Sequence, residues 1–542
     1  MGSSLAQLAN NLPPNRFQLL DNYFSGMTND QRELIKQKGY YPYSWVSSFS
    51  KFSSPALPPK SEWKNSLDSF AVTLTDDEYN HALNVFQSLN CHNFGEYHDI
   101  YLKCDTLILA CVFEEFRSVC YGTYGLDCAQ FFTASNLSGA AYLKVCKPEL
   151  ELLTCREMLD MTENLTRGGV SSVYSKRLAI ANNKFLPNYN PDKPSTFIIF
   201  IDANNLYGGI MEKRCLPLKN FEWVNVNVEE VLSTPDDAQC GYIVEVDLEY
   251  PDYLHEEHSD FPLAPTKDTV NRCWLSDYQL DLMGDLRSTC QNKKLLQTLH
   301  NKSRYTLHYV TLKLYVKLGL RVTHVHRIMR FTQSKWMAPY IQLNTNRRKL
   351  AANKFQQDFF KLMSNSAFGK LCEGKRNRVS VRVVRDENAL LDETQKSNVK
   401  TVNIIDQSLA TVNSKQIKIA WDKPTLVGAV VLDLAKEFMF NFHYNVMKKN
   451  FDCTLLYSDT DSFVYEIRTD DFYGDLRKNE QVKTLFDFSN MPTSNPLHNK
   501  SNERETLLFK DEMAGRLIRE HCALKSKLYS VLAEGNYTFG YL

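Results

Sequence analysis

No excess of either charge marks this sequence. Lys and Arg together number 63, Asp and Glu also number 63, and the formal net charge is zero. This balance excludes a protein that attracts nucleic acid through its bulk charge. Any binding of nucleic acid must therefore come from local concentrations of cations.

Paired cysteines, a leader segment and long apolar runs are also missing. The 14 cysteines are scattered singly, and even the nearest pair, Cys104 and Cys111, is not a Cys-x-x-Cys motif, which argues against a zinc ribbon or a disulfide scaffold. The N-terminus lacks the basic and apolar parts of a signal peptide, and Ala6 stands where a myristoylation motif requires Ser or Thr. No apolar run reaches the roughly 18 residues of a membrane span. We expect a soluble intracellular protein, nuclear or cytoplasmic, with no membrane partner.

The apolar content is high enough for a folded protein. The chain has 542 residues, of which 43% are hydrophobic and 12% aromatic, enough for several domain-sized units. Residue patterns predict an irregular segment at 1–70, helices at 75–122 and a polar segment at 181–196. They predict alternating strands and loops at 220–335, a basic helical region at 345–372, a mixed segment at 376–423 and a long helix at 426–449. Helices between distant strands predict an α+β fold.

Two apolar, β-prone runs end on carboxylates. The first, Phe197–Asp202, ends on one acid, and the second, Leu455–Asp461, ends on Asp459 and Asp461. A carboxylate at the end of a buried strand needs a partner or a cation. Acids on two adjacent strands would suit two Mg²⁺ ions and phosphoryl transfer. A lone acid of this kind would more often cap a turn or lie on the surface, but three acids favour a shared site.

Aromatic and basic residues accompany these acids. Leu206 and Tyr207 follow Asp202 after a short turn, and Tyr207 is either the wall of a site or a core tyrosine. Lys361, Asn365 and Phe368 share one helix face, which could receive a nucleotide. Lys354 extends that face, as does Arg347 if the helix is unbroken. From Arg347 to Arg378 nine cations face two acids, a local net charge of 9 − 2 = +7, although a solvated helix face would look the same.

Three weaker patterns remain. Tyr101 and Asp105 lie at i and i+4 of an apolar helix, Arg167–Gly169 precedes a short strand, and Lys527–Tyr529 places a cation and an aromatic ring on one strand face. Each could contact a metal or a nucleic-acid backbone. A helix surface, an ordinary turn and a strand edge are their respective alternatives.

Taken in order, these motifs resemble family B DNA polymerases. Asp202–Tyr207 is similar to motif A, Lys361–Gly369 to motif B with Phe368 in place of Tyr, Tyr457–Ser462 to motif C, and Lys527–Tyr529 to the following Lys-x-Tyr motif. The resemblance is to the protein-primed branch of Polinton/Maverick-type transposons, linear plasmids and certain phages. A reverse transcriptase would be expected to have adjacent acids in place of Asp459-Thr-Asp461.

Two further phrases, Tyr250–Pro265 and Leu312–Leu320, are similar to the Polinton-type enzymes, so the resemblance covers nearly the whole chain. It implies a right-hand polymerase fold of palm and fingers with two insertions, which are associated in such enzymes with terminal-protein binding and with strand displacement. It also implies DNA template and primer, dNTPs and a terminal protein primer as partners.

The resemblance further implies roles for single residues. Asp202 and Asp461, with the carbonyl of Ala203, would hold two Mg²⁺ ions, or Mn²⁺ in their place, and Asp459 would assist. The expected dNTP-binding residues are Leu206, Tyr207 as the steric gate against a 2′-hydroxyl, Lys349, Lys361, Asn365 and Phe368. The expected DNA-binding residues are Arg167, Gly168, Gly169, Lys370, Lys527 and Tyr529.

The sequence also departs from the family pattern. Tyr101 and Asp105 resemble the third exonuclease motif, but the first two motifs are missing, so we expect a truncated ribonuclease H-like domain without proofreading. Thr166 replaces the Tyr of the linker motif Tyr-x-Gly-Gly, and the thumb is expected to be largely missing. The alternative function is an inactive transposon or viral remnant that only binds DNA.

The resemblance divides the chain into seven segments. They are the exonuclease remnant (1–160), the linker with the start of the palm (161–207), the palm with the first insertion (208–335) and the fingers (336–372). The second insertion (373–423), the rest of the palm (424–530) and the start of a thumb (531–542) follow.

Overall fold

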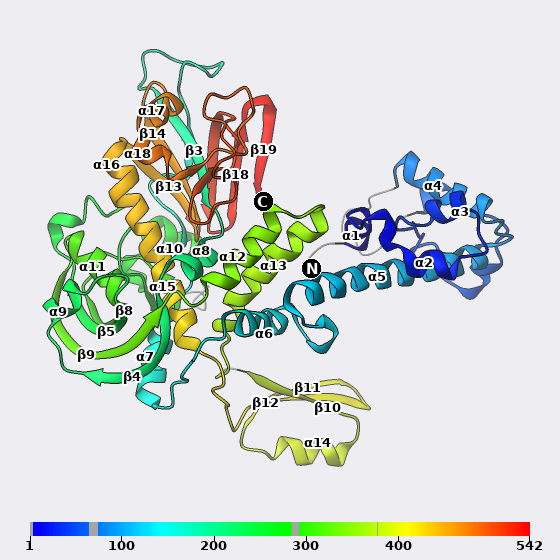
Figure 1. Ribbon diagram of the computed structural model, residues 1–542, viewed down its shortest axis with the longest axis horizontal. Coiled ribbons are helices and arrows are strands. Elements are labelled where there is room, and N and C mark those ends of the chain that lie inside the picture. The colour runs from blue at the N-terminus through cyan, green and yellow to red at the C-terminus, as the bar shows by residue number, and fades with distance from the viewer. Residues whose placement is uncertain (1–3, 64–73, 285–291, 377, 542) are drawn as a thin grey trace. The chain divides into compact units, whose positions relative to one another are not determined.

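The computed structural model describes residues 4–63, 74–284, 292–376 and 378–541. Its residues group into two compact units (Figure 1). The first unit combines Met1–Val145 with Leu343–Ser366, and the second combines Cys146–Gln342 with Ala367–Leu542. Helices and strands both contribute, which confirms the predicted α+β class.

The described residues of the first unit form helices joined by loops, with no strands. Its helices are α1 (Leu5–Asn10), α2 (Gln18–Tyr23), α3 (Asn29–Leu34), α4 (Asp76–Ser88), α5 (Phe94–Tyr124) and α6 (Ala134–Cys146), with the short turns η1 (Pro14–Arg16), η2 (Phe49–Ser53), η3 (Lys60–Glu62) and η4 (Cys128–Gln130). The 31-residue α5 begins after an Asn93 cap and ends at Gly125, whose φ of 63° is a left-handed value that favours glycine.

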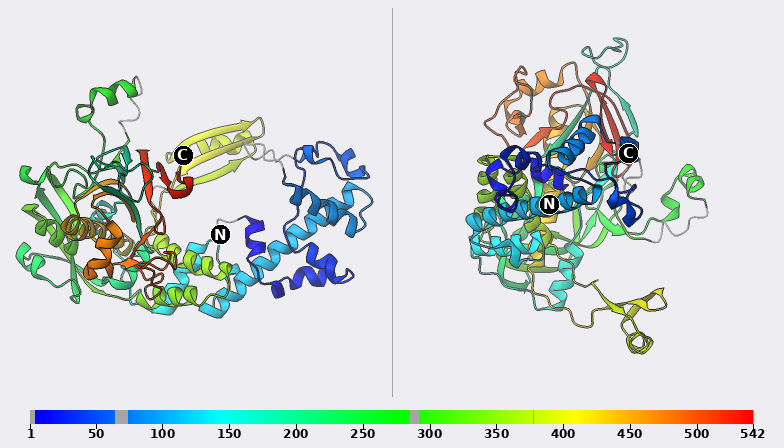
Figure 2. Two further views of the ribbon diagram at one scale, coloured as in Figure 1. Left: turned by 90° about the horizontal axis from the view of Figure 1, so that it is seen from above. Right: turned by 90° about the vertical axis from the view of Figure 1, so that its right-hand side faces the viewer.

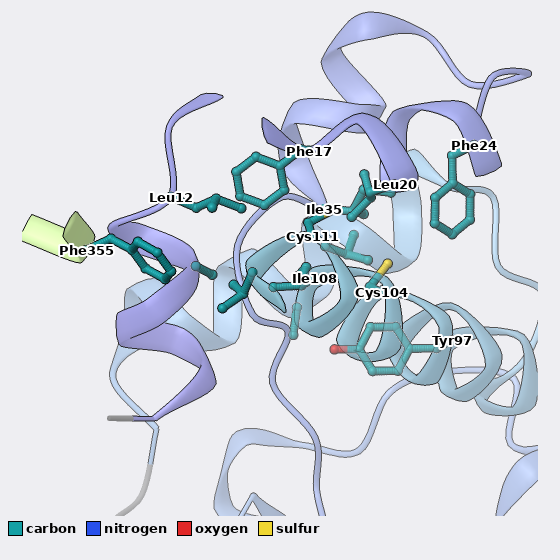
Figure 3. Close-up of a cluster of buried hydrophobic side chains, with 14 of the residues drawn as sticks. Leu12, Phe17, Leu20, Phe24, Ile35, Tyr97, Cys104, Ile108, Cys111 and Phe355 are labelled. Carbon is teal, nitrogen blue, oxygen red and sulfur yellow. The ribbon is translucent and has the colours of Figure 1, made fainter. Parts of the chain in front are cut away.

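The core of this unit lies between α5 and the residues before it. Leu20 and Ile108 are fully buried there, and Phe17, Ile35 and Cys111 pack into the same cluster (Figure 3). The expectation of irregular structure over residues 1–70 is therefore wrong for α1, α2 and α3. These helices have only six residues each, too few to show the periodicity of an amphipathic helix.

Two helices carry the basic region. They are α12 (Ala338–Lys349) and α13 (Lys354–Leu371). The chain is not helical between Lys349 and Lys354, so Arg347 does not continue the face of Lys361, and that part of the prediction is wrong.

The second unit is built on a ten-stranded sheet with the main order β1-β13-β14-β3-β17-β18-β19. Its strands are β1 (Ser171–Val173), β2 (Leu178–Ile180), β3 (Thr196–Ala203), β13 (Cys453–Asp459), β14 (Ser462–Arg468), β15 (Phe486–Asp487), β16 (Phe509–Asp511), β17 (Ile518–Lys525), β18 (Leu528–Ala533) and β19 (Tyr537–Tyr541). β19 pairs with β18 from Tyr537↔Ala533 to Tyr541↔Tyr529, so the segment predicted to start a thumb adds a strand to this sheet, and its assignment to a thumb stays a prediction.

Helices of the second unit pack around one central apolar helix. This is α15 (Thr425–Phe442), which is buried on nearly all sides and contacts α7, α8 and α11. The other helical elements are α7 (Arg156–Leu165), α8 (Leu206–Lys213), η8 (a π-helix, His443–Met447), α16 (Lys448–Asn450), α17 (Phe472–Lys478), α18 (Glu480–Lys483) and η9 (Glu534–Asn536).

The first insertion contains a four-stranded sheet of order β4-β9-β5-β8 and a two-stranded sheet β6-β7. Its elements are β4 (Leu216–Val224), α9 (Val228–Ser233), β5 (Cys240–Glu249), η5 (Asp252–Leu254), β6 (Thr266–Asp268), η6 (Arg272–Trp274), α10 (Asp277–Met283), β7 (Lys294–Leu296), β8 (Lys302–His308), α11 (Tyr309–Lys317) and β9 (Arg321–Ser334). The prediction of alternating strands and loops in this region is wrong for α11. The β-branched and aromatic residues of this helix favour strands, but its burial in the core overrides that propensity.

The second insertion is a small body of three strands and one helix, β10 (Val379–Val384), α14 (Glu387–Thr394), β11 (Val399–Asp406) and β12 (Leu409–Lys415). The order is β10-β12-β11, and α14 packs against β11 and β12 (Figure 2). An ion pair between Arg382 and Glu393 links β10 to α14.

Candidate active site

The two acidic runs lie on β3 and β13, which are separated in the sheet by the single strand β14. In the order β13-β14-β3, Asp459 pairs with Ser462, and Ser462 pairs in turn with Asp202. The backbone N–H of Ala203 donates to the carbonyl oxygen of Asp461 at 2.7 Å, which ties the end of β3 to the turn between β13 and β14. Most residues of both runs are buried, including successive residues that point to opposite faces of the sheet. Residues far apart in sequence therefore place three acids at one end of the sheet.

A lysine on another turn contacts one of these acids. Lys527 Nζ donates to both carboxylate oxygens of Asp459, at 2.9 and 2.7 Å, and this contact raises the pKa of the lysine. The backbone N–H of Lys527 also donates to the hydroxyl of Tyr457 at 2.9 Å. The sequence predicted that Lys527 lies on a strand, but the structure places it in the turn between β17 and β18, with a φ of 59°. Its ammonium therefore points at the acids.

Asp461 carries a charge that the protein does not neutralise well. Burial, and then the charge of the neighbouring Asp459, raise the pKa of Asp461. In the part of the chain that the structure describes, no three His, Cys, Asp or Glu side chains form a group that could hold a metal ion. Mg²⁺ commonly binds through one or two carboxylates, with waters and substrate phosphates as its other ligands. The hard oxygen donors Asp202 and Asp461 fit that ion, and a cation would relieve the charge on Asp461.

An aromatic stack lies beside the acids. The rings of Tyr207 and Phe368 are 4.1 Å apart and nearly parallel, at 11°. Burial first, and then the charges of Asp461, Cys372 and Asp459, raise the pKa of Tyr207, so its phenol lies within electrostatic range of the turn. Tyr207 and Phe368 are both half-buried, and Leu206 is fully buried, so the Leu206 side chain is part of the core.

The other expected nucleotide contacts belong to the first unit. Lys361 and Asn365 are exposed on α13, and Lys349 is exposed at the end of α12. Further along α13, Lys370 is half-buried and pairs with Glu373 at 2.8 Å.

The linker residue Arg167, a predicted DNA contact, is held by the protein. Its side chain is buried, donates to the carbonyl oxygen of Thr306 at 2.7 Å, and stacks over the ring of Tyr305 at 4.0 Å. Tyr529 is likewise in the core, with its ring 5.0 Å from that of Tyr457.

A separate polar cluster surrounds Tyr101 and Asp105 in the first unit. Lys38 Nζ donates to the Tyr101 hydroxyl at 2.9 Å and to Asp105 Oδ2 at 2.8 Å, while Tyr43 and Tyr101 share a hydrogen bond of 2.7 Å. Sequence reasoning missed Lys38, because a residue 67 positions before Asp105 has no spacing that marks it. Lys38 neutralises the only acid in this pair.

Comparisons with known proteins give one family and one structural likeness. The sequence profile described as "DNA polymerase type B, organellar and viral" matches residues 17–425. A search of curated proteins finds no match. In the described residues, no helix is both long and apolar enough to cross a membrane.

Solved structures of Phi29 DNA polymerase are similar to this chain. An orthorhombic crystal form matches at 14% identity and a TM-score of 0.49, covering 93% of this chain and 69% of that one. The complex with primer-template DNA and incoming nucleotide matches at 14% identity and a TM-score of 0.48, covering 92% and 67%. These values are too low to carry an argument of their own.

Proposed function

This chain belongs to the organellar and viral type B DNA polymerases, and on that premise we propose that its palm catalyses template-directed transfer of a nucleotide to a 3′-hydroxyl. The predicted type B DNA polymerase family is thereby confirmed, and the protein-primed branch and the right-hand architecture are part of the proposal. The observation that carries the proposal is the convergence of Asp202, Asp459 and Asp461 at one end of the ten-stranded sheet.

Asp202 and Asp461 hold Mg²⁺ in this proposal, with Mn²⁺ as a substitute. The bound ions would lower the pKa of the 3′-hydroxyl and neutralise the triphosphate. The carbonyl of Ala203 is a further proposed ligand. Asp459 assists, and its pairing with Lys527 would place a cation near the reacting phosphate. The reaction is an in-line displacement that depends on positioning and charge.

The nucleotide would enter beside Tyr207. We assign this ring the role of steric gate, because a 2′-hydroxyl on the incoming sugar would clash with it. Phe368 must leave the stack with Tyr207 if a sugar and base are to fit between them. Lys349, Lys361 and Asn365, which are all exposed, are further proposed dNTP-binding residues.

DNA contacts are proposed for a smaller set of residues than the sequence predicts. They are Gly168, Gly169, Lys370, Lys527 and the Tyr529 hydroxyl. Because the chain belongs to the type B DNA polymerases, primer-template DNA and incoming dNTPs are the proposed ligands. The phrases at Tyr250–Pro265 and Leu312–Leu320 support a Polinton-type transposon as the source and a terminal protein as a primer.

Proofreading is not part of the proposal. The ammonium of Lys38 already neutralises Asp105 and contacts Tyr101, so these two residues would not provide a two-metal exonuclease site.

Primer extension tests the proposal. The full chain is given a primed DNA template, the four dNTPs and Mg²⁺, and Asp461→Asn is compared with Asp252→Asn, the same change at a fully exposed carboxylate. We expect extension by the parent and by Asp252→Asn, and a loss of about 100-fold or more in Asp461→Asn. The alternative is an inactive remnant that binds DNA; it is supported if a folded, DNA-binding parent does not extend the primer at all.

A further inference from the structure

A segment of the linker lies directly against the turn between the two acids of β13 and β14. The backbone N–H of Thr460 donates to the carbonyl oxygen of Val170 at 2.7 Å. The next residue, Ser171, pairs with Asp459 as β1 joins the sheet. We call residues Arg167–Ser171 the strap.

The strap is fixed at its start. Arg167 is anchored on β8 by its hydrogen bond to the Thr306 carbonyl, and its own carbonyl oxygen accepts from Lys436 Nζ at 2.8 Å. Lys436 is buried in α15, where burial lowers its pKa to about 8. At the other end, the hydroxyls of Ser171 and Ser526 are 2.7 Å apart. The strap is therefore held by three parts of the second unit and cannot easily move away from the turn.

Contact between strap and turn requires glycine at position 169. A Cβ atom added to Gly169 would lie 2.5 Å from both Cγ2 and Oγ1 of Thr460, closer than atoms can approach. The neighbouring Gly168 is different, because a Cβ added there meets nothing within 4 Å. Only one of the two adjacent glycines is thus required by packing.

The turn itself has a strained backbone. Thr460 has a φ of 65°, a left-handed value that is unfavourable for a β-branched residue. Such a conformation persists only when surrounding contacts hold it. Here the contacts are the hydrogen bond to Val170 and the packing of Gly169 against the Thr460 side chain.

We propose that Gly169 is a positioning residue, and that the strap holds the Asp459-Thr460-Asp461 turn in the geometry that binds the metal ions. This rests on the proposed polymerase function and gives the linker a second role, in addition to its proposed contact with DNA. It explains why the strap is anchored so firmly by Arg167. A shift of about 1 Å at a site of this kind can cost roughly 100-fold in rate.

The test compares three single variants with the parent, all as full chains. They are Gly169→Ala, Gly168→Ala and Gly374→Ala, the last being another glycine whose added Cβ meets nothing within 4 Å. Mn²⁺ affinity, hydrogen exchange at the Thr460 amide without metal, kcat and KM for dNTP, and DNA affinity are measured.

Gly169→Ala is expected to weaken Mn²⁺ binding about tenfold and to speed Thr460 exchange. Its kcat should fall about 100-fold with little change in KM. In Gly168→Ala and Gly374→Ala, Mn²⁺ affinity should stay within about twofold of the parent. Thr460→Gly in the Gly169→Ala background should restore Mn²⁺ affinity and kcat, because it removes the clashing atoms and suits a positive φ.

Other outcomes overturn the proposal. If Gly169→Ala weakens DNA binding while Mn²⁺ affinity and Thr460 exchange match the parent, the linker contacts template and does not position the turn. If both adjacent variants lose Mn²⁺ affinity equally, the specific contact of Gly169 is not responsible. A parent that never extends a primer would refute the proposed function alone, since Mn²⁺ affinity and amide exchange would still decide the role of the strap.

Discussion

At the residue scale, the palm site treats two neighbouring carboxylates, Asp459 and Asp461, differently. Asp459 is neutralised by Lys527, whereas burial works against ionisation of Asp461. The protein thus keeps one carboxylate paired and leaves the other dependent on a cation that it does not itself supply. Such an arrangement costs stability in the metal-free state, as is typical of sites organised for function.

This cost predicts that Asp461→Asn stabilises the metal-free protein. The pKa of Asp461 is raised on folding, so the native state binds more protons than the unfolded state, and stability falls as pH rises above the unfolded pKa. Asn removes this penalty. We expect a higher unfolding temperature for Asp461→Asn at pH 7 to 8 in EDTA, with the difference shrinking toward pH 3, where both side chains are neutral.

Thermal unfolding across this pH range, followed by circular dichroism, provides the measurement. Adding Mg²⁺ should stabilise the parent more than the variant. A variant less stable than the parent at pH 8 without metal would show that the Asp461 carboxylate is already compensated in the fold.

The stacked ring of Tyr207 leads to a second prediction. Removing it in Tyr207→Ala should open the space beside the incoming sugar, so that discrimination between dNTP and rNTP falls by about tenfold or more. Tyr207→Phe keeps the ring that stacks on Phe368 and should retain the discrimination. Single-nucleotide incorporation with dNTP and rNTP gives both ratios, and unchanged selectivity in Tyr207→Ala would contradict a steric gate.

At the element scale, the features predicted correctly are those carried by long, uniform patterns. The apolar runs to Asp202 and Asp459 are strands, and the apolar stretch around Tyr101 is part of α5, since burial of many consecutive residues leaves a pattern in sequence. The shared chemistry of the acids predicted that the strands ending at Asp202 and Asp459 lie side by side, but β14, which lies between them in the sheet, was not predicted.

The features that were missed depend on single long-range contacts. Nothing next to Arg167 in sequence indicates that its guanidinium stacks on Tyr305, 138 positions later, as opposed to binding a phosphate. The direction of Lys527 depends on a left-handed turn that a Lys-x-Tyr pattern does not reveal. Lys38 was missed for the same reason. Propensity and spacing are local, whereas these contacts are set by the packing of distant elements.

The second insertion has its own sheet and helix, which predicts that it can be removed. Lys375 closes its base by donating to the Ala420 carbonyl at 3.0 Å and pairing with Asp422, so the chain enters and leaves close together. Replacing residues 379–415 with a short Gly/Ser linker should leave extension on a single-stranded template within about twofold. Strand displacement, associated with this insertion in the resemblance, should be lost.

Gel assays on a gapped template, with and without a downstream strand, separate these activities. If extension on single-stranded template falls as much as displacement does, the insertion supports the palm itself. The unfolding transition of the shortened chain shows whether the remainder still folds cooperatively.

At the scale of the whole molecule, electrostatics must act locally. With 63 cations and 63 acids, the chain has no net charge to attract DNA, yet residues 347–378 carry a net charge of 9 − 2 = +7. Lys349 and Lys361 are exposed members of this group. A neutral protein with one concentrated basic region binds a polyanion through that region, and its affinity should depend on salt through the phosphates contacted there.

We therefore predict that the position of the lysines, and not the total charge of the protein, sets the salt dependence of DNA affinity. The double variant Lys349→Ala/Lys361→Ala should reduce the slope of log K against log salt by about 1.4 for a single-stranded template, roughly 0.7 per lost phosphate contact. Lys193→Ala/Lys449→Ala changes net charge equally at two other exposed lysines and should leave the slope unaltered. Fluorescence anisotropy of a labelled oligonucleotide between low and physiological salt measures both slopes. Equal reductions in the two variants would mean that overall charge governs binding, and would remove the basic region from the proposed nucleotide and DNA contacts.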